Sequence, residues 1–481
     1  DEPEHRLKKD LSALDLVVFG VGVIIGAGIF VLTGQAAAEW AGPAIALSFV
    51  IAAVACALAA LCYAEFASSV PVAGSAYTFS YATLGELIAW TIGWDLALEF
   101  TVGSAALSTG FSGYLQEILA GTPLEIPAAL SSAEDGVLNL PALLIALAVM
   151  TVLIVGIKLS SRINQVVVAI KVLVVLVVIA AGIAYIDGGN YTPFVPPAEA
   201  PAEGSGGFLD LPLIQSLFGL DPAVYGIGGV VTAAAIVFFA FIGFDVVATT
   251  AEETRNPQRS LPRGILGSLA IVTVLYVAVA LVLTGMVRYT ELQTQPDGTR
   301  ATLATAFTSL GVDWAATVIA IGALAGLTTV VMVMLLGQIR VFFAMSRDGL
   351  LPRGFSHTGS HGTPVRATVL IGAVVAVAAT FFPAGALEEM VNIGTLFAFV
   401  LVSIGVVVLR RTRPDLPRAF RTPLVPLVPI LAVLACVWLM INLSVETWLR
   451  FVVWMLVGIV VYFAYGHSHS RLGQQERSRT E

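Results

Sequence analysis

Long apolar runs occupy most of this chain and decide the class of fold that it can adopt. Hydrophobic residues make up 58% of its 481 residues and charged residues only 12%, which excludes a soluble globular domain. An outer-membrane barrel would need segments of roughly ten residues with alternating polarity, whereas these runs are continuous. Backbone polar groups in hydrocarbon must bond within the protein, so the runs predict an all-α polytopic membrane protein.

Windows of membrane length predict about twelve membrane-spanning helices. The third run is long for a hydrocarbon core of about 30 Å, so we expect a tilted helix there. The stretch before the first run is charged and polar, unlike a cleaved signal sequence, so we expect the first span to be retained. The predicted spans are residues 14–38, 43–67, 83–119, 139–157, 163–186, 226–251, 263–287, 313–345, 365–383, 386–409, 424–442 and 447–466.

The basic residues predict the orientation of the chain. An even number of spans places both termini on one side of the membrane. If that side is the cytoplasm, only Arg288, Arg300 and Arg450 of the 24 lysines and arginines lie outside, and only Lys171 lies within a span. The positive-inside rule therefore predicts a multi-pass protein of the cell membrane with both termini cytoplasmic.

Other partners and chemistries find little support in the composition. The net charge of −8 is divided between loops on two sides of a membrane, so we expect lipid and no nucleic acid as partner. Cys56, Cys62 and Cys436 fall in apolar runs, where they serve as small packing residues rather than as a disulfide framework or a metal site. No phosphate-binding loop or nucleophile and base pattern is present, so we expect neither an enzyme nor a cofactor.

Glycines interrupt the first apolar run in the middle of the membrane. Gly22, Gly26 and Gly28 lower the cost of leaving helical geometry at a depth where water is absent. A helix broken there leaves a half-helix N-terminus with free N–H groups, which can hold a carboxylate. The alternative is that these glycines only let a neighbouring helix approach closely.

A second interruption favours the functional interpretation. The stretch 238–245 breaks the sixth run, which begins what we predict to be the second half of the chain. Paired breaks at corresponding positions of two halves are typical of a transporter's substrate site. We therefore expect two inverted five-helix repeats and two appended helices. The expected segments are a cytoplasmic N-terminus (1–13), the first repeat (14–186), an extracellular loop (187–225), the second repeat (226–409), the appended helices (410–466) and a cytoplasmic tail (467–481).

Four ionisable residues lie within predicted spans: Asp95 and Glu99 in the third, Lys171 in the fifth and Asp245 in the sixth. A charge at mid-bilayer costs at least ~2.5 to 3.5 kcal/mol, so each is a functional candidate. Lys171 is too deep to reach the interface easily. Structural alternatives remain: Glu99 can pair permanently with Lys171, Asp95 can be a local hydrogen-bond acceptor, and Asp245 can cap exposed N–H groups.

Further polar residues allow two interpretations each. Thr328 and Thr329 in the eighth span can form an ion or coupling site, or can bond back to their own helix. A set of charged residues at cytoplasmic span ends can form an inner gate or can be solvated interfacial charge. This set comprises Glu65, Glu252, Glu253, Arg255, Arg340 and Arg347.

Four motifs in this order resemble the amino acid–polyamine–organocation superfamily, and within it the cationic amino acid transporter family with its prokaryotic relatives. The resemblance covers nearly the whole chain. The motifs are GVGVIIGAGIF at 20–30, YAEFAS at 63–68 followed by PVAGSAY at 71–77, FAFIGFD at 239–245 with Glu252, Glu253 and Asn256-Pro257, and MSRDGLLP at 345–352.

The resemblance implies the five-plus-five fold with broken helices 1 and 6 and two appended helices. It also implies a substrate-binding site, in which N–H groups of the first break hold the α-carboxylate and carbonyls of the second face the α-amino group. Lys171 matches a lysine of proton-coupled members, and Thr328 and Thr329 match the eighth-span side of the same coupling site. The implied substrate residues are Ile24, Gly26, Ala27 and Gly28 for the carboxylate, Phe239, Ala240 and Ile242 for the amino group, and Met334 at the side-chain end of the pocket.

We therefore predict a proton-coupled symporter of L-amino acids that works by alternating access. Met334 supplies volume and no charge, which favours small or medium neutral substrates over arginine and lysine. Loss of hydration favours a neutral Lys171, whereas carbonyls of the first helix favour the ammonium, so its protonation can change with conformation. As an ammonium, Lys171 can bridge the first helix near Gly22 to Val23 and the eighth near Thr328. Glu99 and Asp245 complete the predicted coupling residues.

The alternatives are a cationic amino acid transporter, an exchanger without net proton movement, and a channel or sensor on the same scaffold. A channel would need a continuous polar lining, and no such run of residues occurs in the sequence. The sequence does not specify the preferred amino acid, the stoichiometry, the oligomeric state or an accessory subunit.

Overall fold

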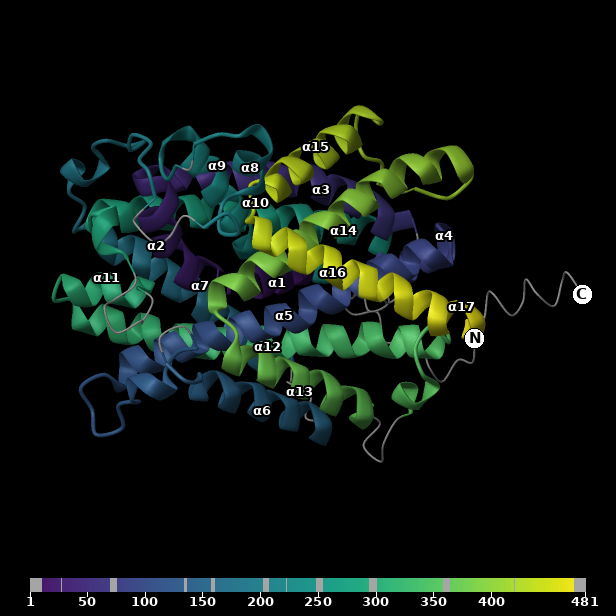
Figure 1. Ribbon diagram of the computed structural model, residues 1–481, viewed down its shortest axis with the longest axis horizontal. Helices are drawn as coiled ribbons and strands as arrows, with labels where there is room; N and C mark the ends of the chain where they lie inside the picture. The colour runs from purple at the N-terminus through teal and green to yellow at the C-terminus, as the bar shows by residue number, and fades with distance from the viewer. Residues whose placement is uncertain are drawn as a thin grey trace, which may run out of the picture.

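Helices running along one long axis build the molecule (Figure 1). A computed structural model describes residues 11–26, 28–69, 76–133, 136–156, 161–201, 207–221, 223–247, 254–293, 301–357, 364–418 and 420–470. Within these ranges the β contacts are isolated bridges, and seven helical stretches are long and apolar enough to cross a membrane, accompanied by four shorter apolar helices. The expectation of an all-α polytopic membrane protein is confirmed.

The helices of the first half follow the predicted spans closely. The first span is divided into α1, a π-helical turn (Gly28–Leu32) and α2, and the third is preceded by the separate short helix α4. The bounds are α1 (Ala13–Ile24), α2 (Thr33–Ala36), α3 (Ile45–Ser69), α4 (Ala76–Thr83), α5 (Glu86–Leu119), α6 (Leu140–Val155) and α7 (Ser161–Ile183).

The helices that follow include both long and shorter apolar ones. Short helices α8 and α11 lie between the long ones, and α17 ends the described chain. The bounds are α8 (Leu213–Phe218), α9 (Gly226–Val237), α10 (Pro257–Met286), α11 (Leu303–Ser309), α12 (Asp313–Arg347), α13 (Val365–Phe381), α14 (Ala384–Thr412), α15 (Leu427–Ile441), α16 (Val445–Val461) and α17 (His467–His469).

Local residues determine where several of these helices begin and end. Ser12 accepts a hydrogen bond from the N–H of Asp15, whose carboxylate in turn accepts from the N–H of Ser12, so that α1 begins with a capping box. Asn139 caps α6 by accepting from the N–H of Ala142. The same helix ends at Gly156, whose φ of 77° lies in the left-handed region that favours glycine.

The packing of the long helices is consistent with two related halves. α1 packs against α10 just as α9 packs against α3, and α7 packs against α12 just as α14 packs against α5. Three further contacts join corresponding helices, namely α3 with α10, α5 with α12 and α6 with α13. Exchanging the halves converts each of these contacts into itself or into another of them. This pattern supports our division into repeats at 14–186 and 226–409, which remains a proposal.

An aromatic clamp joins the last long helix to α5. The indole N–H of Trp94 donates to the carbonyl of Trp454, and the indole N–H of Trp454 donates back to the carbonyl of Trp94, while the two rings stack with centroids 4.5 Å apart. Trp90 donates to the carbonyl of Gly458. A Cβ at Gly458 would lie 2.4 Å from the ring of Trp94, so only glycine permits this contact.

The described chain ends at one end of the bundle. In Figure 1 α4 and α17 lie at one end of the long axis, whereas α2 and α11 lie at the other. We call these the terminal end and the far end. Contacts at the terminal end include the bridge between Leu11 and Thr254 and the approach of Gly349 to the carbonyl of His469.

Candidate substrate site

The first break lies where the glycine motif predicts it. α1 ends at Ile24, and Ile25 adopts an extended conformation with ψ of 101° before a π-helical turn begins at Gly28. Ala27, a predicted carboxylate-binding residue, lies outside the described residues. A Cβ at Gly28 would lie 2.2 Å from the Cα of Ala240, so the two backbones touch there and only glycine fits.

The second break has a different local geometry. α9 ends at Val237 and continues as a 3₁₀ turn (Phe238–Phe241), after which Ile242 is extended with ψ of 136°. Gly243 follows with φ of 119°, a conformation that L side chains rarely adopt. A Cβ at Gly243 would lie 2.8 Å from the side chain of Val23, so the two breaks also meet on this side.

Side chains from neighbouring helices satisfy carbonyls that the first break frees. The ammonium of Lys171 on α7 donates to the carbonyl of Gly22 at 2.5 Å, and the hydroxyl of Tyr276 on α10 donates to the carbonyl of Ile24 at 2.9 Å. Both carbonyls belong to the last turn of α1, where no intrahelical N–H is available. The sequence pattern indicated Lys171 and not Tyr276.

The same arrangement recurs beyond the first break and at the second. The hydroxyl of Tyr114 on α5 donates to the carbonyl of Phe30 at 2.6 Å. The amide of Asn392 on α14 donates to the carbonyls of Ala235 and Ile236 at 2.9 Å and 3.0 Å, at the end of α9. The broken backbone is therefore held by polar side chains from the surrounding helices, as buried polar groups require.

A small cavity, which we call the central cavity, lies between the two breaks. Its volume of about 20 Å³ is enough for about one water molecule. The lining side chains are apolar, so the polar groups that it presents come from the backbone of the breaks. Ala240 contacts Gly28 beside the cavity rather than lining it. The lining residues are Val23, Ile24, Gly26, Gly28, Leu107, Phe239, Ile242, Val330 and Met334.

Comparison with known proteins assigns the family. A family model described as "Amino acid permease" matches residues 11–464. The chain belongs to the amino acid permease family. This match confirms the resemblance to the amino acid–polyamine–organocation superfamily, and it fits a site built from two broken membrane helices.

Similar proteins are named as permeases and transporters, not as enzymes. The chain is 47% identical to the branched-chain amino acid permease BcaP of Bacillus subtilis (strain 168), over 98% of this chain and 96% of the relative. It is 46% identical to a methylthioribose transporter of the same organism, over 97% and 95%. It is 40% identical to the vacuolar cationic amino acid transporter 4 of Arabidopsis thaliana, over 85% and 65%.

Lys171 of this permease is buried between the first helix and α12. Its side chain is only 2% exposed, and a Cβ at Gly326 of α12 would lie 3.0 Å from its Cγ. The nearby threonines bond to their own helix: Thr328 donates to the carbonyl of Leu324, and Thr329 donates to that of Gly326. The interpretation of these hydroxyls as back-bonded side chains therefore describes their geometry in this conformation.

The three acids of the predicted spans, Asp95, Glu99 and Asp245, are all buried. Glu99 has both carboxylate oxygens buried without a hydrogen-bond partner, and its acidic neighbours are Asp95 and Asp245. The suggested pairing of Glu99 with Lys171 is not seen in this conformation, in which both oxygens of Glu99 are without a hydrogen-bond partner and the ammonium donates to the carbonyl of Gly22. Burying an ionised carboxylate without a partner is costly, so Asp95 and Glu99 remain candidates for proton acceptors. The carboxylate of Asp245 accepts from the backbone N–H groups of Gly243 and Val246, as expected of a residue that caps exposed N–H groups.

The charged residues at the terminal end form a different cluster from the one that we expected. Glu65 accepts two hydrogen bonds from the guanidinium of Arg410, each at 2.8 Å, and lies 3.4 Å from Nε of Arg418. It also accepts from the N–H of Thr422. Glu65 thus ties the end of α3 to the connection after α14. Glu252 and Glu253 lie outside the described residues.

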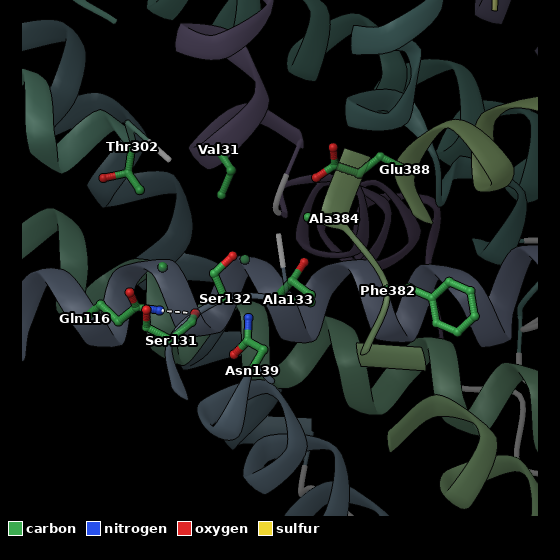
Figure 2. A pocket seen from close by; sticks show the side chains of 13 residues that line it. Val31, Gln116, Ser131, Ser132, Ala133, Asn139, Thr302, Phe382, Ala384 and Glu388 are labelled. Atoms are coloured by element: carbon green, nitrogen blue, oxygen red, sulfur yellow. Dashed lines mark hydrogen bonds between the residues drawn. The ribbon is translucent and has the colours of Figure 1, made fainter. Parts of the chain in front are cut away.

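A larger cavity, which we call the far-end cavity, lies at the far end of the bundle, and no sequence motif predicted it. Its volume is about 60 Å³, and its lining comes from α5, the loop before α6, the first helix, Thr302 before α11 and the start of α14 with the residue Phe382 before it (Figure 2). Glu388 is its acidic residue, only 4% exposed. The sequence pattern does not distinguish Glu388 from an interfacial charge, because this residue lies near the end of a predicted span.

Proposed function

We propose that this permease is a proton-coupled symporter of small or medium neutral L-amino acids, branched-chain ones among them. The observation that carries the proposal is the cavity between two helix breaks, where backbone groups supply the polarity and side chains supply an apolar wall. A free amino acid matches both features of this cavity, because it combines two charged groups with a side chain. The relatives named as branched-chain amino acid permeases, at 47% and 35% identity, support the same substrate class.

Each part of the substrate has a complementary part of the site. The α-carboxylate meets N–H groups near Gly26, Ala27 and Gly28, where the first helix resumes. The α-amino group meets carbonyls near Phe239 and Ile242. The side chain meets the apolar wall, in which a methionine adapts its shape to the ligand.

The cavity is too small for an amino acid, so we assign this conformation to a stage without substrate. The free volume of the cavity, about 20 Å³, must increase before an amino acid can enter. Alternating access requires such a movement, and the contacts between the two breaks would have to change with it.

Lys171 is the residue that we propose for proton coupling. As an ammonium it holds the carbonyl of Gly22 and packs on α12 at Gly326, so it links the moving first helix to its surroundings. Loss of the proton removes the charge from this hydrogen bond and weakens the link. Proton release on the cytoplasmic side would therefore favour the opposite arrangement. Asp245 and Glu99 are the second candidates for the same role.

A second candidate substrate is methylthioribose, because a methylthioribose transporter is nearly as similar to the chain as BcaP is, at 46% against 47% identity. This sugar carries a thioether, which the apolar wall can accept, but it has neither an ammonium nor a carboxylate. It would therefore leave the helix ends of the two breaks without charged partners.

The test is uptake by purified protein in liposomes, with and without an inward pH gradient. The panel comprises leucine, isoleucine, valine, alanine, arginine and methylthioribose. We expect accumulation of the neutral amino acids only with the gradient. Faster uptake of arginine or methylthioribose overturns the substrate assignment, and exchange without gradient-driven accumulation overturns symport.

We also propose that the protein lies in the cell membrane with both termini cytoplasmic. The terminal end of the bundle then faces the cytoplasm, and the far end with its larger cavity faces outside. Accessibility of a cysteine introduced at exposed Ala200 or Ser468, probed with an impermeant reagent on intact cells, tests this orientation. We expect labelling only at Ala200.

A further inference from the structure

The segment that joins α14 to α15 carries a strong positive charge. We call residues 410–426 the arginine connector; residue 419 within it lies outside the described residues. Five arginines against one aspartate give it a formal charge of +4, so the connector attracts anions. The basic residues are Arg410, Arg411, Arg413, Arg418 and Arg421, and the acid is Asp415.

Two of these arginines hold the connector against the end of α3. Arg410 donates two hydrogen bonds to Glu65 and a third to the carbonyl of Thr422 at 3.0 Å. The side chain of Arg418 is only 6% exposed, and it contacts Glu65 and donates to four backbone carbonyls around it. Both guanidiniums are therefore occupied by the protein, and the connector has a fixed shape.

The other three arginines of the connector are exposed. Among the residues that the structure describes, none of Arg411, Arg413 and Arg421 forms an ion pair. The hydrogen bond from Arg410 to Thr422 brings together the two segments that carry Arg411 and Arg421. Three like charges are thus gathered in one place, where an anion between them would relieve their repulsion.

Apolar surface adjoins the exposed arginines on both sides. Ile404 and Val408 are exposed on α14, and Arg411 follows them at helical spacing, so the three share one face of that helix. Leu424 and Leu427 are exposed where α15 begins. α15 packs against α14 and lies at the upper edge of the bundle in Figure 1. The arginines therefore stand where lipid-facing surface ends, which is the level of phospholipid head groups.

We propose that the arginine connector binds the head group of an anionic phospholipid through Arg411, Arg413 and Arg421. The phosphate accepts hydrogen bonds from the guanidiniums, whose planar pairs of donors match phosphate oxygens. The acyl chains lie along the exposed apolar residues of α14 and α15. A free phosphate ion would gain only the first of these contacts, so we assign the site to a lipid. The inference does not depend on which substrate the protein transports.

A bound lipid should stabilise the folded protein. The connector fastens α3 to the end of α14 through Glu65, and a ligand that binds only this folded arrangement raises its stability. The lipid belongs to the leaflet at the terminal end of the bundle. Thermal unfolding of the full chain is therefore a direct measure of occupancy.

The experiment measures the apparent melting temperature of the purified full chain in detergent with added phosphatidylglycerol or phosphatidylcholine. Both lipids supply a phosphate and acyl chains, but only phosphatidylglycerol has a net negative charge. We expect phosphatidylglycerol to raise the melting temperature of the wild type by several degrees more than phosphatidylcholine. In the triple variant Arg411→Gln, Arg413→Gln and Arg421→Gln, its half-saturating mole fraction should rise at least about tenfold, because three head-group contacts lose their charge.

A second triple variant is the matched control. Arg259→Gln, Arg263→Gln and Arg366→Gln together remove three exposed arginines at the starts of α10 and α13, and this variant should respond to phosphatidylglycerol as the wild type does. An equal loss in the control overturns the site, because general surface charge then explains the effect. Equal stabilisation of the wild type by both lipids, or by glycerol 3-phosphate alone, also overturns it.

Lipid retention covers the case in which the triple variant does not fold. Native mass spectrometry counts the lipids that stay bound when the protein is extracted from liposomes with equal amounts of the two phospholipids. We expect the wild type to retain mainly phosphatidylglycerol, and Arg411→Gln and Arg421→Gln each to retain it a few-fold less. Unchanged retention in both single variants refutes the site. Neither measurement involves transport, so a failure of the proposed function would leave these results standing.

Discussion

The two broken helices are supported at equivalent positions by different chemistry. In the first half, Lys171 on α7 donates to a carbonyl in the last turn of α1, with 2.5 Å between Nζ and the oxygen of Gly22. In the second half, Asn392 on α14 donates to the last two carbonyls before the end of α9, at 2.9 Å and 3.0 Å. Both donors lie on the fifth long helix of their half. One can lose a proton and the other cannot.

This difference assigns distinct tasks to the two halves. An amide holds its carbonyls at any pH, so this support of the second break does not respond to protonation. An ammonium holds its carbonyl strongly only while it is charged, so the first break can respond to protonation. We therefore expect proton coupling to depend on the first half, and the predictions below test this asymmetry.

The largest effect is expected where the two breaks touch. Gly28→Ala should abolish leucine binding, because its Cβ would lie 2.2 Å from the backbone of Ala240. Gly26→Ala is the matched control, since its Cβ would lie 3.5 Å from Leu107, an ordinary contact. We expect that variant to bind leucine within about tenfold of the wild type, a cost of about 1.4 kcal/mol. Equilibrium binding to purified, folded protein decides between them, and equal affinity of the two variants contradicts the contact.

The next effect should be the loss of coupling when the first half is made like the second. Lys171→Gln keeps an N–H donor and removes the titrating group, so gradient-driven accumulation should fall to background while exchange of leucine for leucine continues. Lys171→Arg keeps the cation without releasing its proton and should also fail to accumulate. The measurement is uptake with an imposed pH gradient beside counterflow without one. Gradient-driven accumulation by Lys171→Gln would show that Lys171 is not the coupling residue, and Glu99 or Asp245 would then be the candidate.

A smaller, pH-independent effect is expected in the second half. Asn392→Ala leaves the carbonyls of Ala235 and Ile236 without their donor and should cost about 2 kcal/mol of stability. The apparent melting temperature should fall by a few degrees, and uptake should fall by the same factor with and without a pH gradient. A selective loss of gradient-driven uptake would show that the second half also takes part in coupling.

The smallest effect concerns selectivity. Met334 lines the central cavity, and its Cε fills space beside Gly103. Met334→Ser should shift the preference toward longer side chains by a few-fold, because it removes an adaptable apolar group from the wall. Initial rates for alanine, leucine and phenylalanine measure the shift. An unchanged order of preference would place the side-chain pocket elsewhere.

The sequence was sufficient for the helices and for the position of both breaks. Apolar length fixes membrane helices almost alone, because the bilayer forbids other lipid-exposed backbone. The predicted residues Ile24, Gly26, Gly28, Phe239 and Ile242 all line the central cavity, since an interrupted apolar run exposes its backbone wherever it lies in the bundle.

The partners of the breaks could not be predicted in the same way. Tyr276 reaches Ile24 across 252 residues of chain, and nothing in its local sequence distinguishes it from a tyrosine that packs only against lipid or core. Glu65 similarly finds Arg410 across 345 residues. Such pairings depend on the way in which the long helices cross one another, and local sequence patterns do not encode that crossing. The far-end cavity is built from five separate segments and is hidden for the same reason.

The aromatic clamp on α5 has a consequence for the lipid around the protein. This helix has 34 residues, about 51 Å of rise, against a hydrocarbon core of about 30 Å. An isolated helix of that length would change its tilt whenever bilayer thickness changed. Trp94 and Trp454 fasten α5 to α16 through paired hydrogen bonds and stacked rings, and that freedom is lost. In thicker or thinner membranes the lipids must therefore stretch or compress around a rigid protein.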